Sequence, residues 1–155
     1  KIVSSIERLG DYTRSIAGII AKFERPINAD LISNSKIYEM FEISGMMLQH
    51  IQQSFENDDS VLARKSFKLD DELDAINDVA EDVIIKWIQS NPEDIKNSLY
   101  VLNIIKKLER FGDQIKNISH EIIFHQEAKM LKHNKKLIKE LKENLKGINL
   151  NEEEN

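Results

Sequence analysis

Acidic residues four positions apart recur along this 155-residue sequence. On an α-helix, residues four apart lie about 40° apart around the axis, so such a pair presents both carboxylates on one face. Two carboxylates on one face can bind a hard or borderline cation, or the edge of a multinuclear cluster, through oxygen ligands. The spacing therefore predicts three metal-binding pairs: Glu7 with Asp11, Asp70 with Asp74, and Glu109 with Asp113.

A solvent-exposed acidic helix face is the alternative interpretation of the same residues. Asp78 and Glu81 extend the Asp70 pair into a stripe that helical angles place roughly opposite the apolar residues, so we expect it to face away from the core. Like charges four apart destabilise a helix by about 0.2–0.5 kcal/mol each, which calls for compensating cations or basic partner residues. His120 continues the Glu109 row as a ligand or an exposed side chain, and Lys116 beside the row counts against a metal unless it points outward.

One stretch of the sequence occurs twice. "ERLGDYTRSI" at residues 7–16 returns as "ERFGDQIKNI" at residues 109–118, with Glu, Arg, Gly, Asp and Ile at matching positions. A glycine inside a helix costs about 1 kcal/mol relative to alanine. Its presence at the same place in both copies indicates a shared ancestor or a shared packing requirement.

Motifs of common enzyme classes are missing from the sequence. It contains no Glu-x-x-His pair, no phosphate-binding glycine-rich loop, no His-Glu-x-x-His and no Gly-x-Ser-x-Gly. A metalloenzyme would need turnover at a bound metal, and no acid, base or nucleophile pair is placed for it. The sequence therefore predicts a protein that is not an enzyme.

Composition narrows the function classes further. The net charge of −5 argues against non-specific binding to nucleic acid or to an anionic membrane surface. No cysteine is present, and no run of about 18 apolar residues occurs. These features predict a cytoplasmic protein.

Helical periodicity and only five glycines and two prolines predict an all-α fold. We expect a first helix over residues 1–23 that ends before Pro26 and buries one apolar row, and a connector over residues 25–35. The buried row comprises Ile2, Ile6, Leu9, Ile16 and Ile20.

Three further helices are predicted to form an antiparallel bundle over residues 36–126. They span about 36–55, 61–89 and 91–126, and the last begins with Asn91 as N-cap and Pro92 at its first position. For residues 127–155 we expect a charged tail with a short amphipathic helix that frays into an acidic end.

The repeated motif resembles a known family signature. "ERLGDYTRSIA" and "KKLERFGDQIKNISHEIIF" are similar to the two copies of Glu-Arg-Ile-Gly-Asp, then Asn-Ile-Ala, in the PhoU family of bacterial phosphate-uptake regulators. "ARKSFKLDDELDAINDVAEDVI" resembles the family's Asp-Asp-Glu-Val-Asp motif on the preceding helix. The likeness covers roughly residues 1–133. Two positions depart from the pattern: Ser15 replaces the signature asparagine, and His120 stands where an acid is common.

This resemblance implies two similar three-helix bundles. Residues 1–24 would then be the last helix of a truncated first repeat, and residues 36–126 the complete second repeat. The unpartnered first helix would expose its apolar side, fold back on the bundle or pair with another chain, which implies a homodimer or higher homo-oligomer.

The resemblance also implies a function, partners and cofactors. The protein would be a cytoplasmic negative regulator of phosphate uptake and of the phosphate-starvation response. It would contact the ATPase subunit of the phosphate ABC transporter and the phosphate-sensing histidine kinase, and would reach the membrane only through the transporter. Some members bind iron, zinc or other metals through the acid pairs, which here are the six carboxylates named above. The alternatives are the cytosolic domain of a sodium–phosphate symporter and a purely structural helical domain.

Overall fold

The computed structural model describes the backbone of residues 1–152 and the side chains of residues 1–139. All regular structure in this part is helical, which confirms the predicted all-α fold. The elements are α1 (Ile2–Ile20), α2 (Ala29–Ser35), α3 (Ile37–Asn57), α4 (Ser60–Ser90), the 3-10 turn η1 (Pro92–Asp94) and α5 (Ile95–Glu152).

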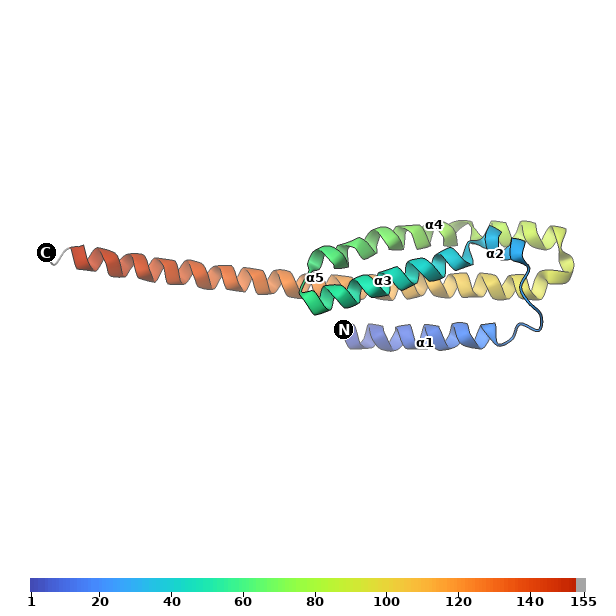
Figure 1. Ribbon diagram of the computed structural model, residues 1–155, viewed down its shortest axis with the longest axis horizontal. Coiled ribbons are helices and arrows are strands. Elements are labelled where there is room, and N and C mark those ends of the chain that lie inside the picture. Colours follow the sequence, from blue (N-terminus) through green and yellow to red (C-terminus); the bar gives the residue numbers. More distant parts are fainter. Residues whose placement is uncertain (153–155) are drawn as a thin grey trace.

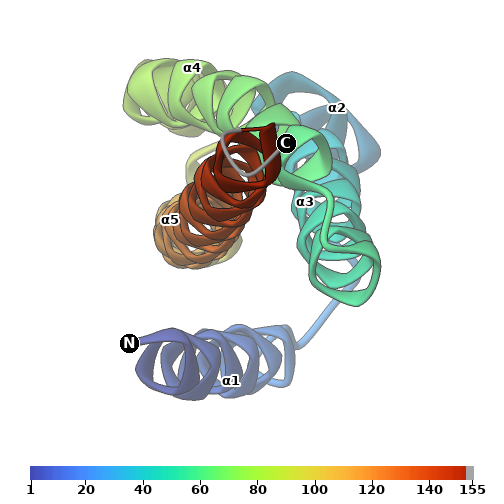
Figure 2. The same ribbon diagram turned by 90° about the vertical axis from the view of Figure 1, so that its left-hand side faces the viewer.

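The long helix α5 is the centre of the arrangement. Helices α3 and α4 pack against each other and against α5, and α1 packs on the side of α5 that faces away from α4 (Figures 1 and 2). Buried apolar residues recur along α5 at alternating spacings of three and four, the pattern of coiled-coil packing. This row comprises Val101, Ile104, Leu108, Phe111, Ile115, Ile118 and Ile122.

Helix α5 has a second row of buried residues because other helices pack on more than one of its sides. It repeats every seven residues and consists mainly of small or polar side chains, which allow close approach of the surrounding helices. Its members are Ser98, Ile105, Gly112, Ser119 and Gln126.

Helix α1 buries a narrower face than the sequence predicted. Leu9, Ile16 and Ile19 are buried, whereas Ile6 is 56% exposed and Ile20 is 50% exposed. Because α1 packs mainly on α5 alone, only one stripe of its surface can be covered. The expected burial of Ile6 and Ile20 is therefore wrong.

The predicted connector over residues 25–35 contains the short helix α2. The side chain of Asn28 caps this helix by accepting a hydrogen bond from the backbone N–H of Asp30 at 2.8 Å. Leu31 is fully buried and fixes the helix to the bundle. The prediction missed α2 because a helix of two turns is too short to show clear periodicity.

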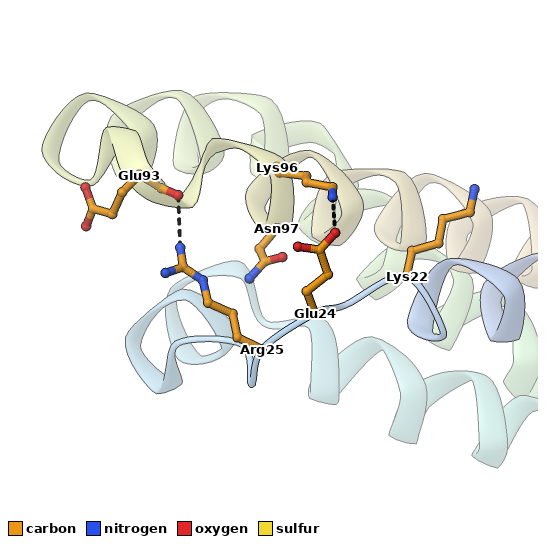
Figure 3. Close-up of a pocket in the computed structure, with 6 residues that line it drawn as sticks. All are labelled: Lys22, Glu24, Arg25, Glu93, Lys96 and Asn97. Carbon is orange, nitrogen blue, oxygen red and sulfur yellow. Dashed lines mark hydrogen bonds and ion pairs between the residues drawn. The ribbon is translucent and has the colours of Figure 1, made fainter.

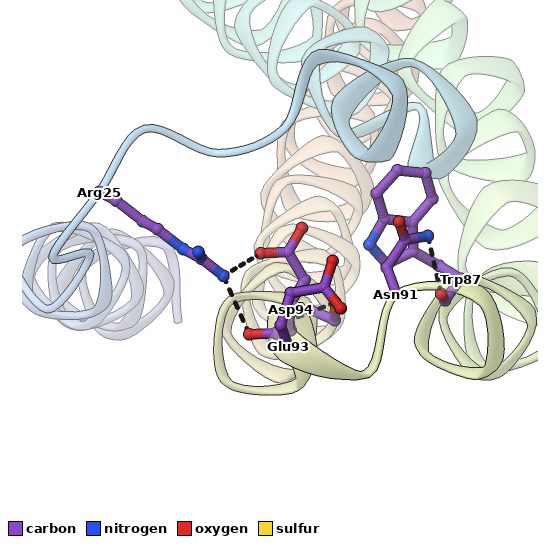
Figure 4. Close-up of polar contacts among 6 residues, drawn as sticks. Arg25, Trp87, Asn91, Glu93 and Asp94 are labelled. Carbon is purple, nitrogen blue, oxygen red and sulfur yellow. Dashed lines mark hydrogen bonds and ion pairs between the residues drawn. The ribbon is translucent and has the colours of Figure 1, made fainter.

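The turn between α4 and α5 is tied to the segment that follows α1. Arg25 donates to the backbone carbonyl of Glu93 at 2.9 Å and pairs with the carboxylate of Asp94 (Figure 4). Lys96 donates to Glu24 at 2.6 Å across a polar pocket of about 410 Å³ (Figure 3). These contacts link the segment after α1 to the start of α5.

Asn91 does not have its predicted role as a side-chain N-cap. Its amide instead donates to the backbone carbonyl of Trp87 at 3.1 Å, at the end of α4 (Figure 4). Pro92 begins the 3-10 turn, where a missing N–H costs nothing.

Helix α5 continues beyond the predicted end near Gln126 and runs to Glu152 without interruption. No glycine or proline occurs between Gly112 and Gly147, and the intervening residues are rich in lysine, leucine and glutamate, which favour helix. The separate short helix expected in the tail is therefore part of α5. The last residues of the predicted acidic end, 153–155, lie outside the described residues.

Candidate functional site

Four of the six predicted metal-binding carboxylates gather where α4 packs on α5. Asp70 and Asp74 come from α4, and Glu109 and Asp113 come from α5; we call these four residues the acidic cluster. Asp70 is 1% exposed, and the other three are half-buried. The expectation that Asp70 and Asp74 face away from the core is therefore wrong, most clearly for Asp70.

The position of Asp70 follows from the packing of α4. Residues three apart on a helix differ by about 60° around its axis, so Asp70 lies beside the fully buried Leu73 rather than opposite it. Ala63 and Ser66, seven and four residues earlier, are fully buried in the same row. Asp70 thus occupies a core position of the helix.

Lys116 on α5 provides the positive charge at the cluster. Its ammonium donates a hydrogen bond to Oδ2 of Asp70 and forms an ion pair with that carboxylate. The hydrogen bond to Asp70 raises the pKa of Lys116, with a further contribution from Asp74 and Asp113. The lysine side chain is 36% exposed, whereas its partner Asp70 is 1% exposed. The aliphatic part of the lysine therefore runs from the surface inward to a buried carboxylate.

Burial and neighbouring negative charge act on two of the other carboxylates, Asp74 and Glu109. Burial raises the pKa of Asp74, and the charge of Asp70 raises it further. Burial also raises the pKa of Glu109, and Asp113 is the next contributor. These shifts show that the four carboxylates interact across the two helices.

The first predicted acid pair and the rest of the acidic stripe on α4 lie apart from the acidic cluster. Glu7 and Asp11 are exposed on α1, and Asp11 pairs with Arg14 at 3.5 Å. Asp78 and Glu81 are exposed on α4, and Glu81 pairs with Lys106. The structure therefore brings together the second and third acid pairs but not the first.

The described residues do not fit a shared metal ion in this arrangement. Within residues 1–139, no three histidine, aspartate or glutamate side chains are grouped so that they could hold one ion. Asp70, the most buried of the carboxylates, is already bonded to Lys116. As placed, the acidic cluster holds α4 and α5 together through an ion pair.

His120 is exposed, and its ring lies 4.7 Å from the ring of Phe67, measured between centroids. It also borders a polar groove of about 320 Å³ between α1 and α5, together with Arg8 and Asn117. Of the two roles predicted for His120, the structure shows the exposed side chain.

The motif glycines have different surroundings in the two copies. A Cβ added to Gly112 would stand 2.6 Å from Cδ1 of Leu73 and 3.2 Å from Oδ1 of Asp70, whereas one added to Gly10 would meet no atom within 4 Å. Gly112 thus permits α4 to approach α5 at the acidic cluster. Only in the second copy does the structure show a packing requirement for the motif glycine.

Sequence reasoning did not identify an apolar groove between α1 and α3. It has a volume of about 640 Å³ and is lined by Ile6 and Gly10 of α1, Leu48 and Phe55 of α3, and by apolar residues of α5. The available signal was the apolar residues of α1 that lie outside a single buried stripe, such as Ile6.

Comparison with known proteins identifies the family. The PhoU domain family matches residues 37–122, which is more than half of the chain and coincides with α3, α4 and the adjoining part of α5. The chain belongs to the PhoU family. Its acidic cluster thus lies within the PhoU domain, and α1 precedes the matched region. Among the described residues, none of the helices combines the length and the hydropathy that a membrane-spanning segment needs.

Several relatives match over most of this PhoU chain. The chain is 30% identical to a phosphate-specific transport system accessory protein PhoU homologue of Aquifex aeolicus over 135 residues, which are 86% of the chain and 59% of the relative. Identity to the homologue of Deinococcus radiodurans is 24% over 123 residues, with coverages of 79% and 56%. The chain thus spans somewhat more than half the length of these relatives. No solved structure gives a significant match.

Proposed function

We propose that this PhoU-family chain is a cytoplasmic, non-enzymatic helical adaptor that regulates phosphate uptake and phosphate-starvation signalling. The observation that carries the proposal is the match of the PhoU domain to residues 37–122, which comprise α3, α4 and the adjoining part of α5. The curated relatives in Aquifex aeolicus and Deinococcus radiodurans, described as accessory proteins of phosphate-specific transport, support the same role.

The exposed acidic face of α4 is the surface we assign to partner binding. Asp71, Asp78 and Asp82 are exposed and lie within about 40° of one another around the helix. A face of this charge attracts basic surface patches and accelerates association with them. The proposed partners are the ATPase subunit of the phosphate ABC transporter and the phosphate-sensing histidine kinase.

The test is a binding measurement with charge reversal on this face. Asp71→Lys combined with Asp78→Lys should weaken capture of the immobilised transporter ATPase at least 10-fold, and the binding of the unmodified chain should fall with added salt. The matched control is Glu42→Lys with Glu56→Lys, which reverses two exposed charges on α3. Equal loss in both variants, or none in either, would count against the α4 face.

A homodimer or higher homo-oligomer remains part of the proposal. Its support is the exposure of large apolar side chains, including Val3 at 79% and Phe55 at 68%. Exposed apolar surface of this kind is often covered by association with another chain. Sedimentation velocity over a range of protein concentrations tests it. A single monomer boundary at all concentrations would contradict self-association.

A further inference from the structure

We infer that Lys116 supplies the positive charge that the acidic cluster requires, in the place that a bound metal ion would otherwise take. The inference concerns how the chain neutralises its own carboxylates, and it does not rest on the proposed adaptor function. It is carried by the position of Asp70, by the reach of Lys116 and by the failure of the carboxylates to form a metal-ligand group.

Water does not hydrate the carboxylate of Asp70. Its carboxylate is 1% exposed and is surrounded by helix packing, with Oδ1 close to the α5 backbone at Gly112. A buried carboxylate is strongly unfavourable unless it is paired and hydrogen-bonded. An ionised Asp70 therefore requires a cation beside it in the folded protein.

Lys116 satisfies this requirement within the chain. Its ammonium binds Oδ2 of Asp70, and it also interacts favourably with Asp74 and Asp113. One ammonium thus interacts with three carboxylates from two helices, which is the electrostatic task of a cation bound between them. A metal ion would have to displace this ammonium from Asp70.

The carboxylates are not arranged to receive such an ion. Across residues 1–139, no three histidine, aspartate or glutamate side chains are grouped so that they could hold one ion. Lys116 is therefore bonded to a carboxylate at a place where a metal ion would not find three such side chains as ligands.

The first copy of the motif provides an internal control. Arg14 stands where the repeat places Lys116, three residues after the motif aspartate in both copies. Its side chain is 85% exposed, and its partner Asp11 is also exposed. A basic residue thus occurs at this position in both copies, but it pairs with a buried carboxylate only in the second.

Thermal unfolding of full-length variants tests the inference. Lys116→Met should lower Tm by roughly 10 °C, because it leaves Asp70 buried without a counter-charge. Asp70→Asn should have a smaller effect, because Lys116 can turn toward solvent. Adding Asp70→Asn to Lys116→Met should recover most of the lost Tm, because a neutral amide needs no cation. Arg14→Met is the matched control and should change Tm by no more than about 1 °C.

Metal analysis of the purified protein separates the two possible sources of positive charge. The unmodified chain, purified without chelator or affinity-tag metal, should contain no stoichiometric iron, zinc or manganese. Stoichiometric metal that is lost in an Asp70→Asn, Asp113→Asn variant would overturn the inference and favour the metal site that the family resemblance implies. The inference would also be overturned if Lys116→Met changed Tm by no more than Arg14→Met does.

Discussion

Gly112 of α5 lies directly against Leu73 of α4, with room for a hydrogen but not for a methyl group. A Cβ at position 112 would stand 2.6 Å from Cδ1 of Leu73, and Leu73 is fully buried. Asp70 lies on the same side, 3.2 Å from that Cβ position. The tight contact between the two helices at Gly112 therefore lies beside Asp70 of the acidic cluster, and the motif glycine makes this contact possible.

Replacing Gly112 by alanine should destabilise the bundle despite the better helix propensity of alanine. Propensity favours the substitution by about 1 kcal/mol, whereas overpacking in a filled core typically costs about 1–3 kcal/mol. We expect a net loss of roughly 1 kcal/mol in the free energy of unfolding, measured by urea titration.

Gly10→Ala is the matched control for Gly112→Ala. Because nothing lies within 4 Å of its added Cβ, this substitution should stabilise the protein by up to about 1 kcal/mol. Opposite signs for the two variants would support the packing role of Gly112, and equal stabilisation would contradict it.

The sequence alone predicted which segments are helical but not how many sides of each helix are covered. The antiparallel helices corresponding to α3 and α4 were predicted within two residues of their observed ends, because apolar residues repeat clearly along both. The periodicity of α5 did not show that this helix packs against α1 as well as α3 and α4.

The acidic cluster was predicted in part. The four-residue spacing correctly placed the members of each acid pair on one helix face, and the repeat drew attention to Gly112. The burial of Asp70 was missed because aspartate at a core position looks like part of a charged stripe until its partner is known. That partner, Lys116, is 46 residues away in the sequence, and a contact at this distance depends on how α4 packs on α5.

Acid should strengthen the contribution of Asp74 and Glu109 to stability before it weakens the rest of the protein. The pKa of Asp74 is raised above 3.8 and that of Glu109 above 4.5, in both cases mainly by burial. A raised pKa means that the folded state binds the proton more tightly than the unfolded state. The stabilising contribution is therefore complete below those ordinary values and is lost as pH rises through the raised pKa values.

Glu109→Gln and Asp74→Asn should remove this pH dependence. Each variant should be more stable than the unmodified chain at pH 7, by an amount that decreases as the pH is lowered toward 4.5. Other charges that act on these two groups, including Asp113, Arg110 and Lys116, remain in place in both variants. Tm measured from pH 4.5 to 7.5 checks the prediction, and a difference that stays constant over this range would contradict it.

The turn between α3 and α4 depends on a side-chain cap. Oδ1 of Asp59 accepts a hydrogen bond from the backbone N–H of Val61 at 2.8 Å, and Ser54 donates to the backbone carbonyl of Asp59 at 2.6 Å. Asp59→Ala should cost about 1 kcal/mol of unfolding free energy, whereas Asp59→Asn should keep most of it because asparagine is an equally good N-cap. Equal losses in the two variants, measured by urea titration, would contradict the capping role.

Removal of residues 134–155 should separate the part of α5 that builds the bundle from the part that extends beyond it. The side chains of residues 127–139 are exposed, and the last buried residue among those described is Gln126, whose amide donates to the backbone carbonyl of Ser54 at 3.2 Å. A chain ending at His133 keeps this contact and the ion pairs of Glu127 and Lys129. We expect its Tm to stay within about 2 °C of the full chain while its helical circular dichroism signal falls in proportion to the helix removed.

A chain ending at Ile123 provides the comparison, because it loses Gln126 and both ion pairs and should unfold at a clearly lower temperature. If the shorter deletion lowered Tm as much as the longer one, the extension would have to contribute to the bundle directly.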